Sequence, residues 1–212
     1  MGSVLDLHVH SRFSLDSPVA PEQYLEALVE LRKTHRINGL AFCEHRTFAA
    51  HQGLKSLAGK YGLIMLAGVE AETRWGHILL FCPDIDWLGS IDFSRKFEAL
   101  EFIAELDKRQ GIAIPAHPFR GMMSLRDNVR KVPGLHALEA INGGNLPEEN
   151  FFARLLAEEL GLAQVGGSDA HFLNELGRGL TEFEAEIASI DEMIQEIKAR
   201  RVRPLYLAEA KL

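Results

Sequence analysis

The stretch Asp6-Leu7-His8-Val9-His10-Ser11-Arg12-Phe13-Ser14-Leu15-Asp16 is the one around which the rest of the chain is organised. His8 and His10 stand one residue apart at the end of an apolar run, which predicts a buried strand at 4–9. Successive side chains of a strand alternate faces, so the two imidazoles share one face, about 6–7 Å apart along the chain. They can bind one metal ion, and Asp16 adds a carboxylate. The two histidines alone would also fit a solvated strand that binds no metal, so the rest of the sequence is needed to choose between the two interpretations.

The composition is typical of a globular chain of one domain. Of the 212 residues, 47% are hydrophobic and 25% are charged, and the net charge is −7. No apolar run approaches the roughly 20 residues of a membrane helix, and we expect no secretory signal at the N-terminus. Cys43 and Cys82 are isolated in apolar runs, which predicts buried, reduced thiols in a cytoplasmic protein. The negative charge disfavours tight binding of long nucleic acid, whereas a small anionic substrate fits beside bound cations.

Short apolar runs alternate with amphipathic stretches, as in a parallel sheet with crossover helices. Strands are predicted at 4–9, 40–43, 63–69, 76–82, 112–116, 135–141, 163–165, 180–183 and 202–207. Helices are predicted at 22–35, 51–60, 94–109, 147–160 and 190–200, with a short one at 124–130. The pattern favours an α/β fold, a distorted seven-stranded (βα) TIM-like barrel formed by one domain at 1–212. A doubly wound open sheet is the weaker alternative, because no glycine-rich nucleotide loop follows the first strand.

A barrel of this kind carries its active-site groups at the carboxyl ends of its strands. Most predicted strands end in a polar or metal-binding side chain: His8, His10, His45, Glu70, His117, Asn142, Asp169 and His171. His77 is the exception, because it lies near the start of its strand. The other three histidines, His35, His51 and His136, are predicted on helix or loop surfaces.

The donor set contains nitrogen and oxygen but no thiolate. Imidazole and carboxylate ligands suit Zn, Mn or Fe. Six histidines (His8, His10, His45, His77, His117 and His171) and three carboxylates (Asp16, Glu70 and Asp169) make nine candidate ligands. Nine are too many for one ion, since a single catalytic zinc needs three protein ligands. The sequence therefore predicts two or three divalent ions with a bridging carboxylate, an arrangement suited to phosphoryl chemistry.

Several motifs occur in a characteristic order: Asp-Leu-His-Val-His-Ser at 6–11, Phe-Cys-Glu-His at 42–45, Gly-Val-Glu at 68–70, Ala-His-Pro at 116–118 and Gly-Ser-Asp-Ala-His at 167–171. Over about residues 5–183 the chain resembles the PHP superfamily, the polymerase and histidinol phosphatase domains. The resemblance implies a distorted seven-stranded barrel and a metal-dependent phosphoric ester hydrolase.

The resemblance also implies three metal subsites. The first ion would be held by His8, His10, Glu70 and Asp169, and the second by Glu70 as a bridge with His77 and His117. The third would be held by Asp16, His45 and His171. A hydroxide bridging the ions would attack phosphorus, with Glu70 and Asp169 as catalytic carboxylates. Glu44 stands where the family usually has Asp, and we expect it to orient His45.

Two arginines are placed to bind phosphate oxygens and assist catalysis. Arg120 follows His117-Pro118, Arg178 lies in the loop after His171, and a guanidinium fork suits a phosphate. Each also fits a surface ion pair, and Arg12 is a weaker third candidate. Asn142 is interpreted either as a residue that binds substrate or water or as a strand-end cap.

The favoured function is hydrolysis of a small phosphomonoester, a nucleotide or a short oligonucleotide. The alternative is a non-catalytic, metal-stabilised module that binds a partner protein; its hallmark, loss of ligands, is not seen here. A metal-dependent amidohydrolase ranks lower, because no strand ends in a lysine that could be carboxylated. The loops at 122–123 and 143–150 are short, which favours an open site. No membrane contact is expected, and the oligomeric state stays open.

Overall fold

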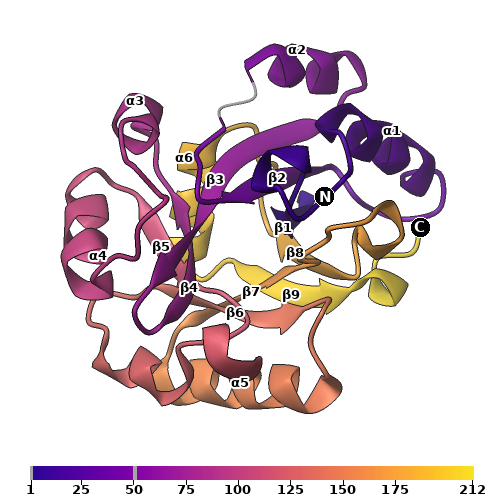
Figure 1. Cartoon of the computed structure of the whole chain (residues 1–212). Coiled ribbons are helices and arrows are strands. Elements are labelled where there is room, and N and C mark those ends of the chain that lie inside the picture. Colours follow the sequence, from indigo (N-terminus) through magenta and orange to yellow (C-terminus); the bar gives the residue numbers. More distant parts are fainter. Residues whose placement is uncertain (1, 50–51) are drawn as a thin grey trace.

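The computed structural model describes residues 2–49 and 52–212, in which strands and helices alternate along the chain (Figure 1). The strands are β1 (Val4–Val9), β2 (Gly39–His45), β3 (Ile64–Thr73), β4 (Gly76–Phe81), β5 (Ile112–Pro115), β6 (Ala137–Asn142), β7 (Ala163–Gly167), β8 (Gly179–Phe183) and β9 (Val202–Tyr206). The helices are α1 (Pro21–Leu31), α2 (Gln52–Lys60), α3 (Ile85–Gly89), α4 (Ala99–Lys108), α5 (Pro147–Leu160) and α6 (Ile190–Lys198). His51, predicted on a surface and at the start of a helix, lies outside the described residues.

Most of the strands form one curled sheet in the order β5-β4-β3-β2-β1-β8-β9. β1, β2 and β3 are parallel neighbours, as predicted. The pairs β3–β4, β4–β5, β1–β8 and β8–β9 are antiparallel, so the expectation of parallel pairing throughout is wrong. Between β3 and β4 the reason is length, because Arg74 and Trp75 form a tight turn that leaves no room for a crossover helix.

The strands β6 and β7 form a separate parallel pair. β6 contacts β5, and β7 contacts β1, β8 and β9, so the pair lies across the open side of the curled sheet. α5 packs on β6 and β7, and α4 packs on β5, on the outside of the strands (Figure 1). The result is an α/β half-barrel in which the backbone ladders do not close into the single seven-stranded barrel that was predicted.

Two helix boundaries differ from the prediction for a local reason. The helix predicted at 94–109 begins at Ala99, because Phe97 pairs with the edge of β3. The Phe97 amide donates to the carbonyl of Glu72 (3.0 Å), and the Arg74 amide donates to the carbonyl of Phe97 (3.2 Å). The helix predicted at 22–35 ends at Leu31.

The short helix α3 was not predicted, although a residue next to it in the sequence indicates its start. Asp84 precedes it, and the Asp84 carboxylate accepts a hydrogen bond from the Trp87 amide (3.0 Å), which caps the helix N-terminus. The helix predicted at 124–130 is a 3-10 helix at Arg126–Lys131. Pro147–Leu160 and its stop at Gly161, with φ 62°, are as predicted.

The interior of the curled sheet is an apolar cluster closed by α6. Leu7, Cys43, Phe81 and Val165 pack there against Ile197 of the helix. Cys43 and Cys82 are buried free thiols, in agreement with the prediction. Among the described helices, none is long and apolar enough to cross a membrane.

The turn between β3 and β4 depends on Gly76. Its φ is 137°, which L side chains rarely adopt, and a Cβ there would lie 2.6 Å from the Ser124 backbone. The Thr73 hydroxyl donates to the Gly76 carbonyl (2.6 Å) and closes the turn. Because the turn holds the next residue, His77, its geometry matters for the site described below.

We expect Gly76→Ala to lower the free energy of unfolding by about 2–4 kcal/mol, through backbone strain and the contact with Ser124. Gly53→Ala is the matched control, because a Cβ at Gly53 in α2 meets nothing within 4 Å. That change should raise stability by about 0.5–1 kcal/mol through helix propensity. Denaturant unfolding of both variants measures the difference, and equal effects would contradict the role of the turn.

Candidate metal centre

All nine ligands predicted from the sequence lie together at one end of the half-barrel. The tightest group consists of His8 and His10 from β1 and its end, Glu70 from β3, and Asp169 after β7. The Nε2 atoms of the two histidines are each 3.2 Å from Glu70 Oε2 and lie 3.4 Å and 3.1 Å from Asp169 Oδ1. All four side chains are buried, so no bulk water balances their charge.

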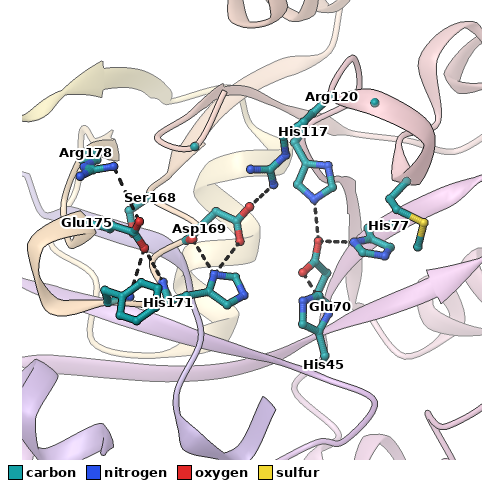
Figure 2. Close-up of a pocket in the computed structure, with 14 residues that line it drawn as sticks. His45, Glu70, His77, His117, Arg120, Ser168, Asp169, His171, Glu175 and Arg178 are labelled. Carbon is teal, nitrogen blue, oxygen red and sulfur yellow. Dashed lines mark hydrogen bonds and ion pairs between the residues drawn. The ribbon is translucent and has the colours of Figure 1, made fainter. Parts of the chain in front are cut away.

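Glu70 links this group to a second one. Its Oε1 lies 3.0 Å from Nδ1 of His77 and 2.9 Å from Nε2 of His117. Figure 2 marks both contacts by dashed lines. His77 reaches the site from the start of its strand because β3 and β4 are antiparallel, with Glu72 opposite His77. The tight turn at Gly76 between two antiparallel strands thus explains how His77 reaches the site although it lies near the start of its strand.

The remaining ligands form a third, more exposed group. Asp16 Oδ2 lies 3.4 Å from Nε2 of His45 and 3.4 Å from Nε2 of His171. His45 also faces Glu70, with its Nδ1 3.3 Å from Oε2. His45 therefore stands between groups, and ligand atoms of His45, Glu70 and His77 lie close enough to form a set of their own.

Glu139 is a site residue that sequence reasoning missed. It is buried in β6, and its carboxylate accepts hydrogen bonds from the His8 ring (Nδ1, 2.9 Å), the His117 amide (2.6 Å) and the Asn142 side chain (3.0 Å). An ionised carboxylate only accepts, so Nδ1 of His8 carries the proton and Nε2 presents its lone pair to the cluster. A lone acid inside the apolar run Leu138-Glu139-Ala140-Ile141 was the available signal.

Ser14 and Glu44 set the orientation of His10 in the same way. The Ser14 hydroxyl donates to Glu44 Oε2 (2.6 Å), so its oxygen is left to accept from the His45 amide (2.9 Å) and from Nδ1 of His10 (3.1 Å). Glu44 also accepts from the amide and hydroxyl of Ser11. The expected effect of Glu44 on His45 is thus indirect, and its closer effect is on the His10 ring through Ser14.

These hydrogen bonds make the donor set fit divalent cations. Because both Nδ1 atoms are engaged in hydrogen bonds, the Nε2 atoms of His8 and His10 face each other at 3.0 Å with their lone pairs. The repulsion between the two lone pairs must be relieved by a shared proton or a cation. The buried Nε2 of His77 has no hydrogen-bond partner among the described residues. Convergent imidazole and carboxylate groups are the ligands of Zn, Mn or Fe sites.

The pKa shifts reflect the same balance of charge. Burial lowers the pKa of His10, but hydrogen bonds to Asp169 and Glu70 outweigh burial and raise it to about 9. Burial would raise the pKa of Glu70 and of Asp169, but the charge of His8 holds both well below the usual range. Burial lowers the pKa of His45 to about 4. Protons on His8 and His10 thus balance the carboxylates, and cation binding must displace them.

Two of the predicted ligands have strained backbones. His117 has a φ of 29° and Asp169 a φ of 56°, in the left-handed region that favours glycine. Hydrogen bonds hold both backbones in this conformation. The His117 amide donates to the Glu139 carboxylate, and the Asp169 amide donates to the His8 carbonyl (2.7 Å). Such strain is concentrated at functional sites.

A cavity of about 610 Å³ opens above the ligands, and the predicted arginines line it (Figure 2). Arg120 forms an ion pair with Asp169, and Gly144 makes room for it, since a Cβ there would lie 2.5 Å from Arg120 Nη1. Arg178 is half-exposed and lies 3.9 Å from Glu175. Arg12 does not line this cavity; its guanidinium lies over the exposed ring of Phe13.

Asn142, interpreted from the sequence either as a residue that binds substrate or water or as a strand-end cap, is not among the residues that line the cavity. Asn142 is fully buried, and its Nδ2 donates to Glu139 and lies 3.4 Å from Asp169 Oδ2. Its Oδ1 accepts from the Gly144 amide (2.9 Å). The side chain of Asn142 thus contacts both carboxylates and the Gly144 amide. His35 and His136 lie away from the cavity, as predicted.

Comparisons with known proteins give one partial family match and several similar folds. Residues 147–202 match a protein family described as PHP-associated. Among solved structures, PsfC from Pseudomonas syringae has a TM-score of 0.76 at 20% identity, covering 99% of this chain and 94% of that one. A candidate metal-dependent phosphoesterase from Bifidobacterium adolescentis has a TM-score of 0.65 at 20% identity, covering 94% and 96%. No curated protein matches the sequence.

Endonuclease Q, solved with a duplex substrate carrying an abasic lesion, has a TM-score of 0.69 at 19% identity. The alignment covers 94% of this chain but 57% of that protein, so the chain spans little more than half of it. The family match is confined to residues 147–202, and the solved structures share the fold of this chain.

Ser14→Ala tests the hydrogen bonds that orient His10. The change leaves the His10 ring and the His45 amide without their acceptor, so we expect a loss of about 1–3 kcal/mol in stability. We also expect the His10 ring to lose its single tautomer, observed as altered 15N shifts of Nδ1 and Nε2 in the zinc-loaded protein. Ser14→Thr keeps the hydroxyl and serves as control. Unchanged His10 shifts in Ser14→Ala would contradict this role.

Proposed function

We propose that this chain is a metal-dependent hydrolase, and specifically a phosphoesterase. One observation carries the proposal: the nine predicted nitrogen and oxygen ligands, Glu70 among them, lie in contact with one another, and two arginines line the cavity beside them. Ligands of this kind bind divalent cations, and arginines bind phosphate oxygens. A site that combines the two is suited to a phosphate ester.

The ligand groups suggest how the ions would be held. His8, His10, Glu70 and Asp169 would hold one ion, and His77 and His117 would complete a second with Glu70 as the bridge. Asp16, His45 and His171 would hold a third. The two or three ions would be Zn, Mn or Fe, and when bound they activate water and neutralise charge on the phosphoryl group.

The chain's own residues then divide into two roles. Glu139 and Ser14 hold the rings of His8 and His10 with Nε2 toward the site. Arg120 and Arg178 bind the non-bridging phosphate oxygens and assist catalysis from above the ligands, since both guanidinium groups line the cavity. Asn142 keeps the carboxylate of Asp169 in place.

The proposed substrates are small phosphomonoesters, nucleotides or short oligonucleotides. The cavity of about 610 Å³ is within the usual size of a small-molecule site. Endonuclease Q, whose structure holds a DNA duplex, shares the fold and supports a nucleic acid as one substrate class. We further propose a single domain over 1–212 and a cytoplasmic location, which the two free, buried cysteines support.

Hydrolysis of p-nitrophenyl phosphate by protein loaded with Mn, Zn or Fe tests the function. We expect turnover that a chelator abolishes and that His8→Ala lowers by at least about 100-fold, because the change removes one ligand of a metal site. His136→Ala, a histidine away from the cavity, is the matched control. Elemental analysis should show lower metal content in His8→Ala only.

Metal-loaded protein that hydrolyses neither this ester nor nucleotides, oligonucleotides and histidinol phosphate would contradict the phosphoesterase. If chelation also lowered its melting temperature sharply, the non-catalytic partner-binding module would be the better description. Turnover of amides in place of phosphate esters would identify an amidohydrolase.

Arg178→Ala should raise KM for p-nitrophenyl phosphate by roughly tenfold with a smaller effect on kcat, because it removes a charged donor to the phosphate. Arg203 is also exposed and paired with an acid, Glu182, but does not line this cavity, so Arg203→Ala is the control. The steady-state constants of both variants measure the effect. Equal KM values for Arg178→Ala and the wild type would show that Arg178 only forms a surface ion pair.

A further inference from the structure

The two arginines of the cavity have a contact in common, the loop at 143–146 that joins β6 to α5 and is called the glycine loop. A Cβ at Gly143 would lie 2.6 Å from the Cβ of Arg178, and one at Gly144 would lie 2.5 Å from Nη1 of Arg120. The backbone of the loop is therefore packed against both side chains. Because both approaches are too close for a Cβ, the path of the loop constrains where the two arginines lie.

One buried side chain, Asn150 of α5, fastens the glycine loop on both sides of its two glycines. Its Oδ1 accepts hydrogen bonds from the Asn142 amide (3.0 Å) and from Nδ2 of Asn145 (2.9 Å). Its Nδ2 donates to the Asn142 carbonyl (3.1 Å) and to the Tyr206 hydroxyl (3.2 Å). The side-chain amide of Asn150 thus uses two acceptor and two donor positions on the end of β6, the loop and β9.

Asn150 occupies a position of α5 that otherwise carries apolar side chains. It is 3% exposed and shares the inward face of the helix with Ala153, Leu156 and Ala157. Burying an amide costs free energy unless its polar atoms are paired. The four partner groups lie outside α5, so the hydrogen bonds of Asn150 fix the glycine loop and not the helix that carries the side chain.

The proposed metal ligands are held in place independently of Asn150. Asn142 pairs with Gly167 in the β6–β7 ladder, and the Gly143 amide donates to the Gly167 carbonyl (2.9 Å). These backbone contacts join the start of the loop to the strand that precedes the ligands of the β7 loop. Loss of the Asn150 amide would therefore loosen the rest of the glycine loop while the ligands stay in position.

We propose that Asn150 is a positioning residue that holds the glycine loop, and through it Arg120 and Arg178, where both guanidinium groups bind one phosphoryl group. This inference rests on the proposed phosphoesterase function. Two guanidinium groups bind the same phosphate tightly only when both are held near their bound positions, because a mobile arginine loses conformational entropy on binding.

Asn150→Ala tests this role in the metal-loaded full chain. It should raise the Kd for inorganic phosphate, measured by calorimetry, and KM for p-nitrophenyl phosphate by about tenfold each, with kcat changed by less than about threefold. The metal content, measured by elemental analysis, should stay the same. Asn38→Ala is the matched control, because the Asn38 side chain accepts from the Val4 amide (2.7 Å) at the opposite ends of the strands. It should lower the melting temperature and leave both constants unchanged.

A double-mutant cycle distinguishes positioning from a general loss of stability. If Asn150 acts through the arginines, Asn150→Ala should change the Kd for phosphate by less than about twofold in the background Arg120→Ala/Arg178→Ala. Tyr206→Phe is a milder variant, since it removes one partner of Asn150 that does not line the cavity. It should raise the Kd by about twofold to threefold, and only when the arginines are present.

The outcomes separate the inference from the function beneath it. Additive effects of Asn150→Ala and the arginine changes, or an unchanged Kd in folded Asn150→Ala, would overturn the positioning role and leave the phosphoesterase intact. If Asn150→Ala does not fold, equal Kd values for Tyr206→Phe and the wild type would overturn it in the same way. A wild-type chain that neither hydrolyses the ester nor binds inorganic phosphate would count against the phosphoesterase itself.

Discussion

The site depends on one buried carboxylate. The two oxygens of Glu70 face ring nitrogens of five histidines at 2.9–3.3 Å, with His77 and His117 on one oxygen and His8, His10 and His45 on the other. A buried carboxylate is costly unless positive charge compensates it, and here protons or divalent ions on the surrounding groups supply that charge. Removing Glu70 would leave those rings without their common partner.

The mixed sheet provides the geometry that this cluster needs. Parallel strands deliver polar side chains from their carboxyl ends, as β1 and β2 do with His10 and His45. Glu70 lies within β3, opposite His45 in the register. The antiparallel hairpin after β3 adds a ligand from the start of a strand, His77. Departure from a regular barrel thus increases the number of side chains that can reach one point.

Around the ligands lies a layer of buried polar groups that determines which ring nitrogens face the site. Glu139 on β6 accepts a hydrogen bond from Nδ1 of His8, and Ser14, whose hydroxyl donates to Glu44 of β2, accepts one from Nδ1 of His10. These residues are far apart in sequence and meet only in the fold. Their effect is energetic, because a ring in the wrong tautomer presents a hydrogen atom where a lone pair is needed.

The sequence by itself determined the order of the nine strands and of the helices other than α3, and the residues that converge, because hydrophobic periodicity and strand-end placement are local properties. It also predicted α5 to the residue. It did not determine the antiparallel pairs, the start of α4 at Ala99 or the burial of Asn142, since each follows from contact with a distant segment. The hydrogen bonds of Glu139 and Ser14 and the cavity beside the ligands were decided by tertiary structure alone, because hydrogen-bond partners and cavities exist only once separate segments are brought together.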